Sequence, residues 1–274
     1  MNIRFAGKSI QGRREYNQDR ILFKSEGDCF IAAVADGMGG YSGGEVASRI
    51  VAELCERKFE AFAASPRPDL IEKMLLGIVE ESRAAIRIKA HEQTELKDMG
   101  TTLTVAAGCA GEYVVGNIGD SRTYLIDASG IVQLTRDNSF VQEYKSKYPD
   151  GEVEDSVLRN MSNALTRSLS GGDHEMDIYP GGNRRFTLEK GAVLLLCSDG
   201  LIIDKVGDVS AQLLKIVRRA GSPAKAANAL IDWAYVNGSS DNISVILAYE
   251  GEWEAAEGNP VQDLIRRIGR SARR

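Results

Sequence analysis

The chain has 274 residues, of which 43% are hydrophobic, and its formal net charge at pH 7 is -5. This length and apolar content suit one large domain or two small ones with a sizeable core. They argue against an intrinsically disordered chain. The negative charge argues against a general nucleic-acid binder, which usually presents a basic face. The N-terminus carries no apolar stretch of the signal-peptide type, and no segment reaches the roughly 18 apolar residues of a membrane helix. We therefore expect a cytoplasmic protein without a membrane span.

Two apolar segments near the N-terminus predict a β-hairpin. Residues 20–24 and 29–35 alternate or run apolar as strands do, and the Gly27-Asp28 pair between them is a typical turn. A glycine-rich stretch at 37–44 follows the second strand directly. The chain must therefore turn sharply where the hairpin ends.

Two long helices are expected next. From Glu45 to Ala64 the apolar residues recur at helical spacing. After a proline-containing break, Asp69 is placed to cap a second helix. The apolar stripe of this second helix comprises Leu70, Met74, Ile78, Ala85 and Ile88. We interpret each stripe as a helix face packed on a sheet.

The middle of the chain has the pattern of an antiparallel meander. Three strand-like runs, 101–107, 113–117 and 122–126, are separated by glycine-containing turns. Residues 138–183 are more polar and contain several Asn, Pro and Gly residues, so we expect an irregular excursion from the main scaffold. Long excursions inside compact domains are often functional.

Regular structure returns in the last third. Residues 193–197 and 243–249 have the composition of strands, and 208–220 and 223–236 that of helices. The order of strands, helices, many strands, helices and a last strand indicates the α+β class instead of a regular βαβ array.

The composition changes beyond Gly251. Residues 252–260 are typical of a linker, and residues 261–268 place apolar side chains on one helical face, with five arginines between 266 and 274. Two interpretations stand. The segment is either a helix docked on the domain with its arginines in solvent, or a basic tail that contacts a partner or an anionic surface.

The four cysteines, Cys29, Cys55, Cys109 and Cys197, lie far apart and mostly within apolar segments. This pattern predicts reduced thiols in the core instead of a disulfide framework or a zinc site.

Three aspartates share one sequence context. Asp36 follows the apolar run 31–35, Asp199 follows the run 193–197 after one serine, and Asp241 precedes the run 243–247. Each therefore stands at the end of an expected buried strand, beside a turn-forming residue. We predict that these carboxylates converge at one edge of a sheet, where oxygen ligands could hold hard divalent cations.

Other catalytic chemistries lack their residues. The only two histidines, His91 and His174, have no second ligand at a metal-binding spacing. No cysteine has an arginine six residues later, which excludes a thiolate phosphatase, and neither a complete phosphate-binding P-loop nor a Gly-x-Ser-x-Gly motif occurs. Carboxylate and water chemistry remains, in which two divalent ions lower the pKa of a water and direct the hydroxide at phosphorus.

Eight short motifs occur in the order of one known family. They are Arg14-Glu-Tyr-Asn-Gln-Asp19, Ala35-Asp-Gly-Met-Gly-Gly40, Gly100-Thr-Thr-Leu103, Gly119-Asp-Ser-Arg122, Leu134-Thr-Arg-Asp-Asn-Ser139, Leu165-Thr-Arg167, Cys197-Ser-Asp-Gly-Leu201 and Asp241-Asn242. Over residues 1–250 the chain therefore resembles the PPM-type, or protein phosphatase 2C, family of metal-dependent serine/threonine phosphatases. The resemblance implies a four-layer αββα sandwich of two antiparallel sheets flanked by helix pairs. It also implies a flap at about 138–168, and it leaves 251–274 as a linker and basic amphipathic tail.

The resemblance implies a role for each metal ligand. Asp36 would bridge two Mn²⁺ or Mg²⁺ ions, the Gly37 carbonyl would ligate one of them, and Asp199 and Asp241 would ligate the other. Asp120 would help to form a third metal site together with Asp199, or else it is a plain turn aspartate.

Two further residues have implied roles in catalysis. Asp19 would hold a metal-bound water, and Arg14 would bind the substrate phosphate. Because Arg13 adjoins Arg14, a surface ion pair is the alternative explanation for either arginine.

Four positions depart from the common family pattern. Gln18 stands where an acidic residue is usual, so one water-mediated metal contact lacks a charge. Met38 takes the place of a histidine proposed as a general acid in animal members, and we expect water to protonate the leaving alkoxide here. Asn138 replaces a common histidine at the entrance of the flap. Ile203 stands where many members have an aspartate and Asp204 comes one residue later, which makes the third metal the least secure.

The sequence thus predicts a bacterial protein phosphatase that hydrolyses phosphoserine and phosphothreonine by attack of a metal-bridging hydroxide. We expect phosphorylated proteins as substrates, a cognate Ser/Thr kinase as the opposing enzyme, and a monomer. One alternative is a pseudophosphatase that acts as a regulatory binding module, and another is hydrolysis of a small phosphate ester.

Overall fold

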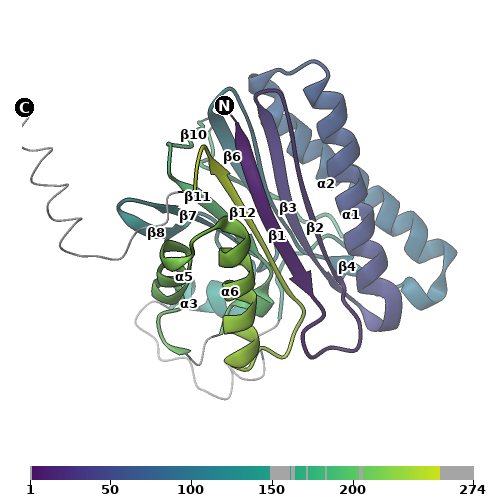
Figure 1. Cartoon of the computed structure of the whole chain (residues 1–274). Coiled ribbons are helices and arrows are strands. Elements are labelled where there is room, and N and C mark those ends of the chain that lie inside the picture. The colour runs from purple at the N-terminus through teal and green to yellow at the C-terminus, as the bar shows by residue number, and fades with distance from the viewer. Residues whose placement is uncertain are drawn as a thin grey trace, which may run out of the picture.

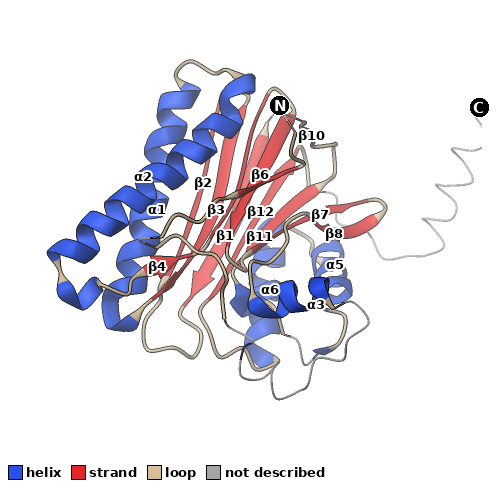
Figure 2. Ribbon diagram, turned by 180° about the vertical axis from the view of Figure 1, so that it is seen from behind, coloured by secondary structure: helices blue, strands red, loops and turns tan. Residues whose placement is uncertain are grey.

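The computed structural model describes residues 2–148, 161, 164–170, 172–182, 184–203 and 206–253. Two antiparallel sheets pack face to face, and a pair of long helices covers the outer face of each sheet (Figures 1 and 2). The predicted α+β class and four-layer αββα sandwich are confirmed. Among the described helices, none is long and apolar enough to cross a membrane. The predicted tail beyond Trp253 lies outside the described residues.

The first sheet has five strands. In spatial order they are β1 (Ile3–Ile10), β12 (Ile243–Glu250), β11 (Val193–Cys197), β7 (Arg122–Asp127) and β8 (Gly130–Gln133). The sequence did not predict β1 or β8. Both lie at edges of the sheet and are only partly buried, so neither shows a continuous apolar run.

The second sheet contains the predicted hairpin. Its strands, in spatial order, are β10 (Phe186–Thr187), β6 (Glu112–Ile118), β5 (Leu103–Cys109), β3 (Cys29–Met38) and β2 (Asp19–Glu26). Two short strands, β4 (Gly100–Thr101) and β9 (Asp177–Tyr179), pair with β3 and β6. The predicted meander is wrong in one respect, because β7 leaves β6 and pairs with β11 in the other sheet.

Central strands are buried on both faces, which explains their continuous apolar runs. Along β3, Ile31 and Ala33 face the outer helices, whereas Ala32 and Val34 face the other sheet. The inter-sheet core also receives Leu194 and Leu196 from β11 and Ile246 from β12. The two sheets therefore hold each other through side chains that alternate along each strand.

The helices α1 (Gly40–Ala63) and α2 (Ile71–Glu92) cover the second sheet (Figure 1). The predicted stripe of α2 is correct only in its middle, because Ile78 is buried and Met74 packs against the core, whereas Leu70 and Ile88 are exposed. The side chains that α2 buries are Ile71, Leu75, Ile78, Val79, Ser82 and Ile86. Asp69 does not cap this helix either. It lies in a 3-10 turn, Pro68–Leu70, and its carboxylate pairs with Arg67.

The helices α5 (Val209–Arg219) and α6 (Pro223–Val236) cover the first sheet and match their predicted ranges closely. The polar excursion contains a short helix, α3 (Phe140–Lys147), capped by Ser139, whose hydroxyl accepts the Gln142 N–H. Trp253 packs edge-on against Tyr249 and donates its indole N–H to the Ala220 carbonyl. The last described residue therefore still contacts the end of α5.

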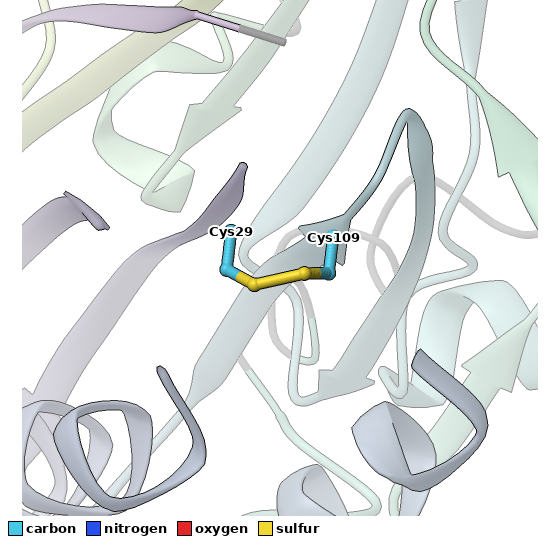
Figure 3. Close-up of a disulfide and its surroundings, with 2 residues drawn as sticks. All are labelled: Cys29 and Cys109. Atoms are coloured by element: carbon cyan, nitrogen blue, oxygen red, sulfur yellow. A yellow bond between two sulfur atoms is a disulfide. The ribbon is translucent and has the colours of Figure 1, made fainter. Parts of the chain in front are cut away.

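The prediction of four free thiols is half wrong. Cys29 and Cys109 form a disulfide between β3 and β5, and Figure 3 shows the two side chains bridging the strands. The strand register places these residues directly opposite each other, although 80 residues separate them in sequence. Cys55 and Cys197 are free and buried, as predicted. Sequence spacing alone could not reveal a pairing that depends on register.

The phase of α2 can be tested with two adjacent leucines. Leu75→Ala removes a fully buried side chain, so we expect it to lower the free energy of unfolding by about 2–5 kcal/mol. Leu76→Ala is the matched control, because the Leu76 side chain is 45% exposed. This substitution should lower the free energy of unfolding by less than about 1 kcal/mol. Urea unfolding measures both changes. Equal losses, or a larger loss for Leu76→Ala, would contradict the observed packing.

Candidate metal centre

The hairpin of the second sheet brings the first two carboxylates together. Asp19 begins β2 and Asp36 lies near the end of β3, and the antiparallel register pairs these two residues directly. Both carboxylates therefore lie at one end of the second sheet. Threonines from β4 and the next residue fix the Asp36 backbone: the Thr101 hydroxyl donates to the Asp36 carbonyl at 2.8 Å, and the Asp36 N–H donates to the Thr102 hydroxyl at 3.1 Å.

The first sheet supplies two more carboxylates. Asp199 follows β11 in a 3-10 turn, and Asp241 precedes β12, which runs antiparallel beside β11. The end of β11 thus lies next to the start of β12. A Cβ atom at Gly200 would lie only 1.9 Å from the Asn242 carbonyl oxygen, so the two turns touch through their backbones. Only glycine permits this approach at position 200.

Asp120 reaches the same place from a connection between the sheets. It lies between β6 of the second sheet and β7 of the first, and the start of β7 pairs with the end of β11 at Arg122 and Cys197. Its carboxylate interacts electrostatically with that of Asp199. The structure therefore brings together Asp19, Asp36, Asp120, Asp199 and Asp241, where the ends of both sheets meet.

Burial and the charges of neighbouring carboxylates raise the pKa values of four carboxyl groups of this cluster, those of Asp19, Asp36, Asp120 and Asp199. Burial raises the pKa of Asp19 to about 7 against the opposing effect of its hydrogen bonds, and the charges of Asp199 and Asp241 add to the rise. Burial, followed by the charge of Asp199, raises the pKa of Asp120 to about 8. The pKa values of Asp36 and Asp199 are raised for the same two reasons, burial first and neighbouring carboxylates second. The protein thus holds acidic groups where isolated negative charge is unfavourable.

The oxygen atoms of this cluster fit a divalent cation. Asp19 Oδ1 and Asp199 Oδ1 are buried and have no hydrogen-bond partner among the described residues. Such unsatisfied oxygens are costly unless another group, such as a hard cation, binds them. Among the described residues no three acidic, histidine or cysteine side chains already form a closed metal shell, and Asp241 instead pairs with Arg14.

Gly37 brings its backbone to the cluster. A Cβ atom at this position would lie 2.1 Å from the Gly44 carbonyl oxygen in α1 and 2.6 Å from that of Gln18. The Gly37 N–H also donates to the Gln18 carbonyl. Any side chain here would separate the end of β3 from the first turns of α1. The helix accordingly begins at Gly40, five residues earlier than predicted, and includes the glycines that permit this contact.

Two serines that sequence reasoning missed orient Asp19. The hydroxyl of Ser244 donates to Asp19 Oδ2 at 2.6 Å, and that of Ser198 donates to the same oxygen at 2.8 Å. Asp19 Oδ1 is left without a hydrogen-bond partner among the described residues, so it can accept a hydrogen bond from a water. The available signal was a serine at a buried position of an apolar strand, since Ser244 lies between Ile243 and Val245.

Asn242 anchors the loop that carries the arginines. Its side-chain amide donates to the carbonyls of Gln11 and Tyr16, both at 2.8 Å, and its Oδ1 accepts the Gln18 N–H. One buried asparagine therefore ties the loop between β1 and β2 to the turn that carries Asp241. The sequence placed Asn242 in a motif without assigning this role.

The structure separates the two adjacent arginines. Arg14 Nη2 donates to Asp241 Oδ2 at 2.6 Å, and half of the Arg14 side chain is exposed. Its positive charge also opposes the rise in the pKa of Asp199 that burial and Asp241 cause. Arg13 extends the other way and stacks on Tyr235 at the end of α6. Arg14 alone thus faces the carboxylates.

Asn138, Met38 and Ile203, three of the residues that depart from the family pattern, have defined surroundings in the structure. Asn138 is buried and holds the turn before Asp120, because its N–H donates to the Gly119 carbonyl and its Oδ1 accepts the Gly119 N–H. Met38 reaches toward Gly100 in β4. Ile203 is buried in the core beneath α5 and α6 and cannot ligate a metal. Asp204 lies outside the described residues.

Known proteins match both the sequence and the fold. A family model described as protein phosphatase 2C matches residues 6–233. The serine/threonine phosphatase stp of Listeria innocua is 32% identical over 245 residues, which are 88% of this chain and 93% of that protein. The crystal structure of the Mycobacterium tuberculosis serine/threonine phosphatase PstP/Ppp superposes with a TM-score of 0.76 at 29% identity, covering 91% of this chain and 99% of the other. A structure of the PstP catalytic domain in complex with two manganese ions gives a TM-score of 0.74 at 30% identity, covering 90% and 97%.

Divalent cations should stabilise the protein through these carboxylates. We expect saturating Mn²⁺ to raise the melting temperature of the wild type by about 5–10 °C relative to the protein in EDTA, because the ion binds only the folded state. Asp36→Asn should abolish most of this rise. In EDTA the variant should melt no lower than the wild type, since it removes a buried, repelled charge. A full Mn²⁺ shift in Asp36→Asn would exclude Asp36 as a principal ligand.

The serine support of Asp19 can be tested separately. Ser244→Ala should weaken Mn²⁺ binding about 10- to 100-fold in isothermal titration calorimetry, because Asp19 loses one of the two hydroxyl donors that orient it. Ser25→Ala, at an exposed position near the other end of β2, is the control and should bind as the wild type does. Unchanged affinity in Ser244→Ala would show that its hydrogen bond does not orient Asp19 for the metal.

Proposed function

The chain belongs to the protein phosphatase 2C family, and on that premise we propose that it is a Mn²⁺- or Mg²⁺-dependent phosphatase of phosphoserine and phosphothreonine in proteins. The observation that carries this proposal is the set of buried and half-buried carboxylates at the meeting of the two sheets, two of which have a buried oxygen without a hydrogen-bond partner. The relatives that match across most of the chain are named serine/threonine phosphatases, and one is a complex with two manganese ions.

We assign the metal ligands as the sequence predicted. Asp36 and the Gly37 carbonyl, together with Asp199 and Asp241, would hold the two ions. When bound, the two ions would supply a water of lowered pKa and compensate charge on the phosphoryl oxygens. Asp120 lies beside Asp199 and is the residue that a third ion would use.

Side chains of this protein would orient the attacking water and the substrate phosphate. Asp19, fixed by Ser198 and Ser244, would accept a hydrogen bond from the attacking water through its free Oδ1. Arg14 uses one N–H on Asp241 and has further N–H groups for the phosphoryl oxygens at the exposed mouth of the site. Met38 offers no proton, so water would protonate the leaving alkoxide of the serine or threonine.

We also propose that the predicted flap, 138–168, borders this site. Its described residues include α3, and residues 149–160 lie outside the described part of the chain. A cavity of about 530 Å³ is bordered by Arg136, Asn138, Glu143, Arg167 and Tyr179, among others. We propose that this side of the site contacts the protein substrate.

A pseudophosphatase is not supported. All of the predicted principal ligands are present, and the matching relatives are named phosphatases. We also propose a cytoplasmic monomer that opposes a Ser/Thr kinase. The kinase, the compartment and the oligomeric state rest on the likeness to bacterial phosphatases and on the sequence.

The activity is tested with a phosphothreonine peptide and Mn²⁺. The wild type should release phosphate, and Asp36→Asn and Asp199→Asn should each lower kcat by more than about a hundredfold, which exceeds the usual effect of an outer-shell residue. Asp232→Asn, at an exposed position of α6, is the matched control and should retain activity. If the wild type is as inert as the two ligand variants, the proposed activity is wrong.

A further inference from the structure

Arg13 occupies a defined place on the surface beside the phosphate-binding Arg14. Its guanidinium carbon lies 5.2 Å from the centre of the Tyr235 ring, within the range of a cation–π contact. Its Nη2 also donates to the Tyr235 carbonyl at 3.2 Å, at the C-terminal end of α6. Both contacts hold the side chain in one orientation, so it loses little additional conformational entropy when a ligand binds.

The charge of Arg13 has no carboxylate partner within the described part of the chain. Arg14 and Arg20 each pair with a carboxylate, on Asp241 and Glu45 respectively, but no such ion pair involves Arg13. The one N–H that bonds the Tyr235 carbonyl leaves other guanidinium donors open to an incoming anion. An exposed, oriented and unpaired cation is therefore present next to the residue that we assign to the phosphate.

The surface around Arg13 suits an extended peptide. The side chains of Tyr235 and Val236 are 43% and 78% exposed, and that of Tyr16, on the same loop as Arg13, is 47% exposed. Aromatic and aliphatic groups beside a cation are typical of surfaces that bind protein segments. Arg13 adjoins Arg14 in the chain, so a phosphorylated segment bound at Arg14 would have Arg13 close by.

We infer that Arg13, held by Tyr235, is a specificity-determining residue that binds an acidic side chain flanking the phosphorylated serine or threonine of the substrate. This inference rests on the proposed phosphatase function and adds the class of sequence that the enzyme prefers. The acidic residue should lie within about three positions of the phosphorylated one. Three residues of extended chain span about 10 Å.

The alternative role of Arg13 is purely structural. A cation that donates to one of the last carbonyls of a helix stabilises that helix end. This role predicts a lower melting temperature when Arg13 is replaced and no change in the choice among substrates. The two roles are therefore separable by measuring selectivity and stability together.

The experiment compares phosphothreonine peptides that differ only in the position of one glutamate, from three residues before to three residues after the phosphothreonine, with an all-alanine reference. For the wild type we expect kcat/KM for the best glutamate peptide to exceed the reference about three- to fivefold at low salt, the range of an exposed ion pair. This ratio should shrink toward one in 0.5 M NaCl. In Arg13→Gln the ratio should be about one at any salt concentration, and in Tyr235→Leu it should be intermediate.

Arg4→Gln is the charge-matched control, because Arg4 is exposed near the opposite end of β1, and it should keep the wild-type ratio. Since each ratio is taken within one enzyme, a general loss of activity or folding cancels. The inference is overturned if the wild type shows no preference, if Arg13→Gln keeps it, or if Arg13→Gln changes only the melting temperature. Hydrolysis of p-nitrophenyl phosphate by the wild type with Mn²⁺ tests the phosphatase activity separately from the role of Arg13. Its absence contradicts the proposed function, whereas its presence without peptide preference contradicts the role of Arg13 alone.

Discussion

Burying several aspartate carboxylates at one end of two packed sheets opposes folding, because each charge loses hydration and repels its neighbours. The raised pKa values of Asp19, Asp36 and Asp120 express this cost. The three apolar cores, one between the sheets and one under each helix pair, must supply the stabilisation that holds the cluster together. A bound divalent cation would relieve the repulsion, so metal binding and stability are linked at this site.

Backbone contacts and hydroxyl groups make the cluster geometrically possible. Gly37 and Gly200 allow turns from different strands to touch, and a side chain at either position would separate the carboxylates. Ser198 and Ser244 come from neighbouring strands of the first sheet and orient an aspartate of the second. The site therefore depends on both sheets at once, and displacement of either sheet would disperse its ligands.

Under the proposed function, Arg13 and Arg14 give one loop two neighbouring roles. Asn242 fixes both ends of this loop through carbonyl contacts, so the two side chains diverge from a rigid base. Arg14 turns toward the carboxylates and Arg13 toward the exposed end of α6. Reaction and substrate choice can thus reside on adjacent residues, because their side chains have different surroundings.

The sequence alone was sufficient to predict the α+β class, the helices 208–220 and 223–236, and the three aspartate turns, because apolar runs, turn residues and capping residues act locally. It also predicted which aspartates the fold collects, through motifs in a known order. Tertiary packing set the phase of α2, because Leu75 and Leu76 both fit a helix but only one of the two side chains can face the sheet. It likewise decided the transfer of β7 to the first sheet, the Cys29–Cys109 pairing, and the support of Asp19 by Ser244. These features depend on strand register and on contacts between residues distant in the chain, which local patterns do not encode.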